Sequence, residues 1–354
     1  MNTKKYTKNK FGLLVFSLIF SLVFAMFCFV GCGQNNQGND EEIPTFPEDE
    51  NAPAYTIDGD YVYFGSYAQT LKAQDVTVSK YPSVEGYYKG SDGEKYVKRT
   101  AKVTVEMPNT ETGEEQANAE EAGDDTTTEE KTYLFEADKD YYFKVEPIKW
   151  RILSQENGEL LLYCVTAIDI VNYQNYGAFE VNADDGKYYL LESDTIPSGT
   201  NGNNYEFSYV RSWLNNDFFN TAFNTKQKAV MLQTEVDNST ATGATSGCEC
   251  QNTNDYVFLL SRNEYANTDY GFSNDRDWVG STTRQFVLSD YAQSVVSGGS
   301  KNTSVWTRSP SNPRGYYSNV YGVMSDGQFN SYFNMVGDNG VGVCPVVKIQ
   351  TKQS

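Results

Sequence analysis

The stretch IKWRILSQENGELLLYCV, residues 148–165, decides the fold. Two runs rich in Ile, Leu and aromatic residues flank the pair Asn157-Gly158. Asn-Gly between two such runs is the strongest short-range signal for a two-residue hairpin turn. We therefore predict two antiparallel strands joined by this turn. The side chains that we expect in the core are Trp150, Ile152 and Leu161.

Strand patterns also precede this hairpin. YTIDGDYVYFGSYAQT at 55–70 has the aromatic content of a strand that ends in a turn. At 95–107 and 131–145, apolar and charged residues alternate, which predicts two strands paired as a long hairpin. Between them, residues 106–130 contain ten acidic residues and no Lys or Arg. Such a run cannot bury a core, so we expect a disordered acidic insertion at about 106–131; a weak cation-attracting loop is the alternative.

The middle of the chain carries helix signals. In SYVRSWLNNDFFNTAF, residues 208–223, Ser208 can cap a helix. Asn224 can cap a second short helix that we expect to reach Leu232. Two helices joined by a tight turn also fit a DNA-binding helix-turn-helix, but the acidic charge argues against that class. The side chains expected on the buried faces are Val210, Trp213, Leu214, Val230 and Met231.

The pattern changes again toward the C-terminus. DYVFLLS at 255–261 predicts a buried strand, and Ser261 with Glu264 forms a capping-box pattern for a short helix. Residues 284–296 predict another helix, and short strands and turns follow. The inward side chains of that helix would be Tyr291 and Val295. Strands, then helices, then strands predict an α+β fold with short helices and twisted antiparallel strands, not an alternating βαβ fold.

Residues 1–31 have the order of a secretory signal. Four lysines precede an uncharged apolar stretch at 11–30, and small residues stand just before Cys32. The ending FCFVGC resembles the lipobox of bacterial lipoproteins, in which the cysteine is acylated and becomes the mature N-terminus; Phe29 stands where Leu is usual. The alternative is an uncleaved membrane-spanning helix, and the polar residues directly after the cysteine favour cleavage. We expect an extracytoplasmic protein, anchored to a bacterial membrane by lipidated Cys32, with an acidic flexible tether at 32–53.

Charge and composition exclude several classes of function. Cleavage after residue 31 would change the net charge from −19 to −23, because the signal holds four lysines and no acidic residue. Such a surface repels nucleic acid, so we expect no nucleic-acid partner, whereas basic proteins and divalent cations fit it. The chain has no histidine. Catalysis by Ser-His-Asp or Cys-His groups and zinc sites built on histidine are therefore excluded.

The cysteine spacing favours a structural role. Beyond the signal and Cys32, the chain has Cys164, Cys248, Cys250 and Cys344, which allow three pairings. A bridge between Cys248 and Cys250 would be strained by its short loop. There is no CxxC pair, so the spacing does not support a zinc site. Structural disulfides or buried thiols are both compatible with this pattern.

Seven strings follow one another along the chain: FGSYAQ at 64–69, EPIKWRIL at 146–153, SYVRSWLNNDFFNTAF at 208–223, NDYVFLLS at 254–261, WTRSP at 306–310, VMSDG at 323–327 and GVCPVVKI at 342–349. Together they resemble a bacterial family of extracytoplasmic domains of unknown function, which looks related to the sulfatase-modifying-factor fold, a C-type-lectin-like variant. The resemblance covers roughly 55–350 except the acidic insertion. Many members carry an Arg in a GVRPA-like final strand, where this chain has Cys344 before Pro345.

The resemblance implies a C-type-lectin-like domain at 54–350, whose first and last strands lie close together and which displays one face of irregular loops. Loops on a rigid scaffold are where binding usually resides. The sulfatase-modifying enzymes use a pair of cysteines, and Cys344 with Cys248 or Cys250 could be imagined in that role. The matching active-site string is absent, so we assign no catalytic residue.

Residues 311–340 are the candidate binding face. They are rich in Tyr, Asn, Ser, Gly and Phe, the composition of adaptable recognition surfaces, although strands and turns could need the same residues. Trp278, in the string NDRDW, is the tryptophan that we expect to be partly exposed. The other candidate ligand-binding residues are Arg314, Tyr316, Tyr317, Tyr321, Phe329, Tyr332 and Phe333.

A structural calcium ion is the one cofactor that the sequence suggests. Carboxylates in Asn- and Gly-rich loops are the oxygen ligands that calcium prefers, but the EF-hand spacing is absent. Solvated loop carboxylates are the simpler interpretation, so we assign no metal site and no cofactor. The residues concerned are Asp275, Asp277, Asp326 and Asp338.

These observations predict a cell-envelope lipoprotein that displays a lectin-like module and binds an extracellular protein or glycan. The alternatives are an oxidase of the sulfatase-modifying type and a structural envelope protein with no specific ligand.

Overall fold

The computed structural model describes residues 43–46, 49, 51–107, 133–275, 278–296, 300–331 and 335–351. The predicted signal, Cys32 and the acidic insertion from residue 108 onward lie outside the described residues. One compact unit begins at Glu42 and runs to the C-terminus. Among the residues described, no helix is both long and apolar enough to cross a bilayer.

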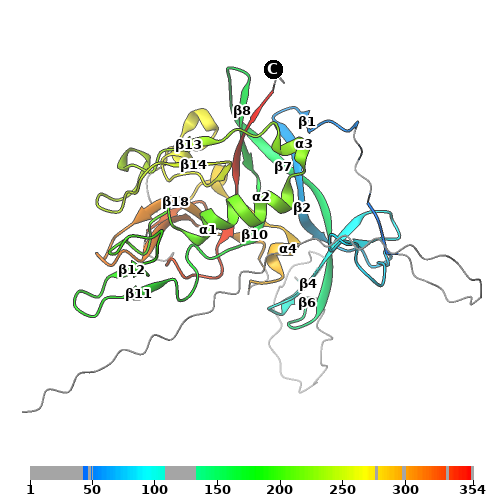
Figure 1. The fold of residues 1–354 in the computed structure, drawn as a ribbon, viewed down its shortest axis with the longest axis horizontal. Helices are drawn as coiled ribbons and strands as arrows, with labels where there is room; N and C mark the ends of the chain where they lie inside the picture. Colours follow the sequence, from blue (N-terminus) through cyan, green and yellow to red (C-terminus); the bar gives the residue numbers. More distant parts are fainter. Residues whose placement is uncertain are drawn as a thin grey trace, which may run out of the picture. The chain divides into compact units, whose positions relative to one another are not determined.

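An antiparallel eight-stranded sheet organises this unit (Figure 1). Its main path runs β1-β2-β7-β8-β22-β15, with β4 added to β7 and β3 added to β4. The predicted hairpin joins β7 to β8, where Asn157 and Gly158 have φ values of 52° and 79° as a two-residue turn requires. The strands are β1 (Tyr55–Asp58), β2 (Tyr61–Leu71), β3 (Tyr88–Lys89), β4 (Lys95–Thr100), β7 (Asp140–Glu156), β8 (Glu159–Cys164), β15 (Val257–Phe258) and β22 (Val346–Gln350).

Short helices begin at the predicted caps. The side-chain oxygen of Ser208 accepts the Arg211 N–H at 3.2 Å, and Asn224 forms a capping box with Gln227. The second helix ends at Lys228, earlier than predicted, although Val230 and Met231 are buried as predicted. The helical segments are α1 (Tyr209–Trp213), the π-helical η1 (Leu214–Phe218), α2 (Phe219–Ala222) and α3 (Thr225–Lys228).

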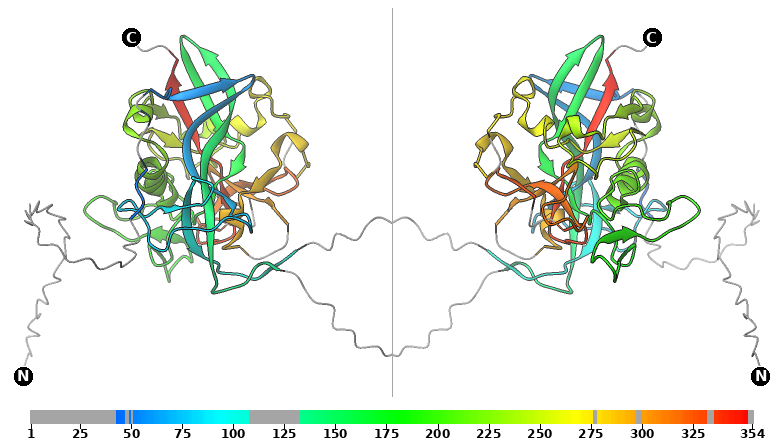
Figure 2. Two further views of the ribbon diagram at one scale, coloured as in Figure 1. Left: turned by 90° about the vertical axis from the view of Figure 1, so that its right-hand side faces the viewer. Right: turned by 90° about the vertical axis from the view of Figure 1, so that its left-hand side faces the viewer.

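The central sheet buries both of its faces, and β8 shows how. Because strand side chains alternate between faces, Leu160 and Leu162 enter one hydrophobic cluster while Leu161 and Tyr163 enter another. The first cluster includes Trp150 and the side chains of α1 and η1; the second includes side chains from the segment 258–292. Figure 2 shows the helices on one side of the sheet and the yellow and orange segments on the other.

Smaller sheets complete the fold. A mixed five-stranded sheet has the order β10-β21-β18-β19-β20, and a three-stranded sheet has the order β17-β16-β9. The strands are β5 (Val105–Glu106), β6 (Tyr133–Phe135), β9 (Thr166–Ala167), β10 (Asp169–Ile170), β11 (Phe179–Val181), β12 (Tyr188–Leu190), β13 (Thr234–Val236), β14 (Thr253–Asp255), β16 (Phe286–Leu288), β17 (Asn302–Thr303), β18 (Val305–Ser311), β19 (Asn319–Val323), β20 (Phe329–Asn330) and β21 (Gly342–Val343). The remaining helical turns are η2 (Thr240–Thr242), η3 (Glu264–Ala266), η4 (Thr268–Tyr270), η5 (Thr282–Arg284) and α4 (Asp290–Gln293).

Two secondary-structure predictions need correction. The helix predicted over 284–296 is a strand, β16, followed by the short helix α4. The run Phe-Val-Leu pairs with β9 and β17, so the helix starts only after Ser289, whose hydroxyl accepts the Ala292 N–H at 3.0 Å. The strand predicted over 255–261 is also shorter and is divided between β14 and β15.

The fold is mostly β, in mixed and antiparallel sheets with a few short helices, and so has less helix than the predicted α+β arrangement. The long hairpin on both sides of the insertion is confirmed, because β4 pairs with β7 and β5 pairs with β6. The first and last strands belong to one sheet, and the Tyr55 hydroxyl donates a hydrogen bond to the Thr351 carbonyl at 3.2 Å.

Candidate functional site

The hairpin of β11 and β12 lies against the C-terminal loop that the sequence selected. The Tyr188 N–H donates to the Tyr316 carbonyl at 2.8 Å, and the Gly202 N–H donates to the Tyr188 carbonyl at the same distance. Tyr316 also lies close to the hairpin turn, since a Cβ added at Gly186 would be 3.8 Å from its ring. Two segments far apart in the chain therefore form one local surface.

Side chains from both segments meet on this surface. The Tyr189 and Tyr317 ring centroids are 6.1 Å apart, and the Lys187 ammonium lies 5.4 Å from the centre of the Tyr317 ring. Asp185 is 3.2 Å from the Lys187 ammonium and accepts a 3.2 Å hydrogen bond from the Tyr189 hydroxyl. We call Asp185, Lys187, Tyr189, Tyr316 and Tyr317 the tyrosine surface.

The charge states of the tyrosine surface are defined at neutral pH. The hydrogen bond that Lys187 donates to Asp185 raises the pKa of Lys187, which keeps its ammonium charged. Hydrogen bonds from the Lys187 backbone and side chain lower the pKa of Asp185, which keeps it ionised. Loss of solvent contact raises the pKa of Tyr189, and so do the hydrogen bond to Asp185 and the charge of that carboxylate. The hydroxyl therefore keeps its proton and remains a donor. The surface thus offers a cation, an anion and the phenol hydroxyl of Tyr189 as a donor.

Tyr317 has an unusual backbone conformation. Its φ is 56°, and its N–H donates to the Asn312 side chain at 3.1 Å. The other non-glycine residues with positive φ in the described ranges are Asp138, Asn157 and Trp278. Asp and Asn tolerate this region, but for a bulky aromatic residue it costs of the order of 1–3 kcal/mol, and such strain concentrates at binding and active sites. Both strained aromatic residues are among those selected from the sequence.

The remaining predicted residues lie in different environments. Arg314 is exposed and precedes the tyrosine surface directly in the chain. Tyr321 is half-buried, with the Arg262 guanidinium 5.5 Å from its ring. Phe329 in β20 is only 1% exposed and lies under the guanidinium groups of Arg262 and Arg284. It is therefore a core residue, and its assignment to the binding face was wrong. Tyr332 and Phe333 lie outside the described residues.

Trp278 is exposed as predicted, with 49% of its surface accessible. It belongs to a different loop, which packs on the turn between β19 and β20 through the hydrogen bond from the Ser281 N–H to the Asp326 carbonyl at 3.0 Å. Buried Arg284 holds the same two segments, since its Nε donates to Gly327 at 3.0 Å and its Nη1 to the Ser273 carbonyl. The contacts of this loop place Trp278 beside the β19–β20 turn, not in the tyrosine surface.

Sequence reasoning missed the hairpin that supplies half of the surface. Asp185, Lys187 and Tyr189 lie in VNADDGKYYLL, residues 181–191. An Asp-Gly pair between a β-branched residue and a run of aromatic and aliphatic residues is a turn signal that could have identified β11 and β12.

The described carboxylates considered as calcium ligands do not converge on one site. Among the residues described, no group of three or more acidic or cysteine side chains is placed to hold a metal ion. Asp275 lies 4.0 Å from Arg284, Asp326 accepts from the side chain of Gln328 at 2.7 Å, and Asp338 accepts the Met335 N–H at 2.8 Å. Asp277 lies outside the described residues. Each described carboxylate thus contacts a different partner, and none shares a partner with another.

The thiols have the properties of structural cysteines. All four described cysteines are free, and Cys164, Cys248 and Cys344 are buried. Burial raises the pKa of Cys164 to about 12 and that of Cys248 to about 11, and it raises the pKa of Cys344 well above its usual value. The thiolate is the reactive form, so these side chains are poor nucleophiles.

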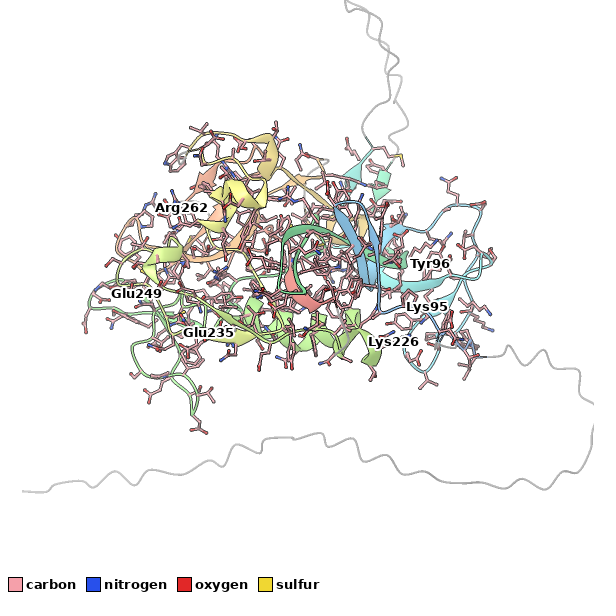
Figure 3. The ribbon with its side chains drawn as sticks, turned by 90° about the horizontal axis from the view of Figure 1, so that it is seen from above. Lys95, Tyr96, Lys226, Glu235, Glu249 and Arg262 are labelled. Carbon is pink, nitrogen blue, oxygen red and sulfur yellow. The ribbon has the colours of Figure 1, made fainter. Side chains whose placement is uncertain are left out.

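The end of the segment predicted as a tether contacts the domain. Pro44 is buried, the Phe46 ring meets the Tyr87 ring edge-on at 6.3 Å, and the Lys95 ammonium lies 5.1 Å from the Phe46 ring. Lys226 donates a hydrogen bond to the Ala52 carbonyl. Figure 3 labels Lys95 and Lys226, which contact this segment at Phe46 and at Ala52.

A groove of about 1030 Å³ lies beside these contacts. Residues of the segment 45–52 form one wall, and α2, α3 and β4 form the others. Its lining has both charge signs, from Asp49, Glu85 and Glu94 and from Lys89 and Lys95, and so defines no single class of ligand.

The comparison with known families covers the C-terminal part of the chain. Residues 185–350 match a family described as a domain of unknown function (DUF6273). No curated protein and no solved structure shows a significant match. All five residues of the tyrosine surface lie within the matched range, whereas six strands of the central sheet precede it, namely β1 to β4, β7 and β8.

Proposed function

We propose that this chain is a cell-envelope lipoprotein whose C-type-lectin-like domain binds a protein or glycan ligand through the tyrosine surface. The observation that carries the proposal is Tyr317, held at a φ of 56° opposite Tyr189 and under the Lys187 ammonium. Backbone strain of this kind concentrates at binding and active sites, and a recognition surface has use for an aromatic ring held in a fixed position.

The geometry suits recognition for energetic reasons. Tyrosine offers a large contact area at the cost of only two side-chain torsions, and its hydroxyl supplies a hydrogen bond. Asp185 fixes both Lys187 and Tyr189 before any ligand arrives. Groups that are already ordered lose less conformational entropy on binding, so more of the contact energy becomes affinity.

The position of the surface supports display from a membrane. The sequence assigns the anchor to Cys32, which precedes the first described residues. In Figure 1 the dark blue segment that follows this anchor joins the domain at the right, while β11 and β12 lie at the left. A ligand approaching the tyrosine surface therefore meets it away from the contacts that the N-terminal segment makes at Phe46 and Ala52.

The scaffold supports the proposed C-type-lectin-like class. That class implies first and last strands close together and irregular loops on one side. Here β1 and β22 share a sheet, and Tyr55 bonds to Thr351. The described residues of 171–208, 312–331 and 335–341 lie mainly in loops and in strands of two to five residues.

Binding arrays would test the proposal. We expect the full chain in non-ionic detergent micelles to bind a protein or glycan, and Tyr317→Gly to weaken that binding at least about tenfold, since glycine keeps the backbone conformation and removes the ring. Tyr61→Ala is the matched control, because Tyr61 also lies under a lysine, Lys149 at 4.0 Å, on another part of the molecule. Equal binding by the wild type and Tyr317→Gly would refute the assigned surface.

A further inference from the structure

We infer that the ligand of the tyrosine surface is a basic protein segment with exposed aliphatic side chains. This inference rests on the proposed function and adds the chemistry of the partner.

Exposed apolar side chains gather around the β11–β12 hairpin. Tyr176 is 93% exposed and Val181 54%, while Leu191, Tyr316 and Met335 are between 40% and 45% exposed. Large apolar groups held in water in one region mark interaction surfaces on soluble domains.

Backbone contacts place Leu191, Tyr316 and Met335 in one neighbourhood. The Leu191 N–H donates to the Ala178 carbonyl, which joins the two ends of the hairpin. Tyr188 joins the hairpin to Tyr316, as described above. Met335 forms a β-bridge with Asn319, three residues after Tyr316. Val181, by contrast, pairs with Tyr188 and so lies on the hairpin face opposite to that of Tyr189.

The charge around the apolar residues is negative. Residues 176–196 contain five acidic side chains and one basic one, Lys187, and exposed Arg314 beside Tyr316 adds a second positive charge, which leaves a net charge of −3. The acidic side chains are exposed, and Asp185 is the one that pairs with this lysine. The five are Glu180, Asp184, Asp185, Glu192 and Asp194. Complementary charge steers association and rejects partners of like sign, so the partner that fits is basic.

The apolar residues favour a protein over a glycan. Leu191 and Met335 are aliphatic, and such side chains contribute to protein interfaces by burying area against other apolar groups. Sugar hydroxyls gain nothing from them, and acidic sugars would be repelled by the surrounding carboxylates. A neutral glycan is the competing ligand, and the experiment includes it.

The test uses the full chain in non-ionic detergent micelles and measures fluorescence anisotropy. The probe is a labelled peptide of alternating lysine and leucine, compared with the same peptide carrying glutamate for lysine and with a labelled neutral oligosaccharide. We expect the lysine peptide alone to bind, with affinity that falls as salt rises. Asp184→Lys with Glu192→Lys should reduce its affinity at least about tenfold.

A matched control separates this surface from general charge attraction. Asp58→Lys with Asp60→Lys makes the same change in net charge, and both residues are exposed at the turn between β1 and β2. We expect this variant to keep nearly all of the affinity.

Tyr316→Ser should weaken binding of the lysine peptide. It should not change the slope of affinity against salt concentration, because it removes apolar contact and no charge.

Each contrary outcome has a distinct meaning. Equal losses in the two charge variants, an unaffected Tyr316→Ser variant, or no binding of the lysine peptide would overturn the inference. Binding of the neutral oligosaccharide that is lost in Tyr317→Gly would overturn it too, yet would leave the proposed function standing. If no protein and no glycan in the arrays bound through Tyr317, both the proposed function and this inference would be refuted.

Discussion

At the scale of single residues, the buried guanidinium group of Arg308 connects segments that are distant in the sequence. Arg308 is 3% exposed in its side chain and pairs with Glu264, while its remaining N–H groups donate to the carbonyls of Leu259 and Asp237. Glu264 also accepts the Ser261 N–H, as the capping-box pattern predicted. One ion pair therefore joins β18 to three other segments of the chain.

This pair makes a prediction about acid stability. Burial alone would raise the pKa of Glu264, but the charge and hydrogen bonds of Arg308, together with the hydrogen bonds from Ser261, hold the pKa below the usual 4.5. The stabilisation is therefore complete above pH 4.5 and is lost as the pH falls through the lower, folded-state pKa. Glu264→Gln should lose roughly 3–5 kcal/mol at pH 7, because it leaves a buried cation unpaired, and should show a weaker dependence on acid below pH 4.5.

Urea unfolding of the wild type and variants between pH 3 and 7 would measure both effects. Glu159→Gln is the control, since the Lys348–Glu159 pair is 33% and 38% exposed and should contribute less than about 1 kcal/mol. If the two substitutions cost the same at pH 7, the pair with Arg308 does not have the role assigned to it.

At the scale of elements, short sequence motifs correctly predicted the helix caps and the central turn. Ser208 and Asn224 cap helices, and Asn157-Gly158 forms the central turn, because each depends on a few neighbouring residues. The strand β16 was taken for helix because Phe286, Val287 and Leu288 gain their strand partners from 166–167 and 302–303, which the local pattern does not contain.

The candidate site was predictable only in part for the same reason. The composition of 311–340 identified Tyr316 and Tyr317, but it could not show that Phe329 turns into the core. Nor could it show that Tyr189 and Lys187, more than a hundred residues earlier, would lie against Tyr317. Contacts between distant segments are set by sheet pairing, which a single sequence does not reveal directly.

The hairpin formed by β5 and β6 predicts how the domain responds to a shorter insertion. Val105 pairs with Phe135 and Glu106 with Tyr133, so the chain enters and leaves at neighbouring positions. Replacing 108–131 with a four-residue Gly- and Asn-containing turn should leave the melting temperature unchanged or raise it slightly, because a shorter loop costs less entropy to close. Calorimetry would check this, and a fall of more than about 5 °C, which is over 1 kcal/mol for a domain of this size, would show that the insertion stabilises the fold.

At the scale of the whole molecule, the range matched by the family and the unit that folds do not coincide. The match begins at residue 185, but β22 pairs along β8 from Val346 opposite Tyr163 to Gln350 opposite Glu159. The compact unit extends from Glu42 to the end of the chain. Arg99 and Asp169, 2.9 Å apart, add an ion pair between β4 and β10, both outside the matched range.

We therefore predict that residues 185–350 do not fold alone. Without β7 and β8, the buried side chains of β22 and of α1 and η1 lose their main partners. Six of these side chains, at about 1.5–3 kcal/mol each, represent roughly 9–18 kcal/mol, comparable to the whole stability of about 5–15 kcal/mol for a typical domain. The six are Val346, Val347, Ile349, Val210, Leu214 and Phe218.

Circular dichroism and hydrogen exchange on separately produced fragments would test this. The fragment 185–350 should show no cooperative thermal transition, and mixing it with the fragment 43–184 should restore one, because the second fragment supplies β2, β7 and β8. A cooperative transition in 185–350 by itself would show that the matched range is a complete folding unit. The central sheet would then be an addition to that unit, and the tyrosine surface would keep its geometry without it.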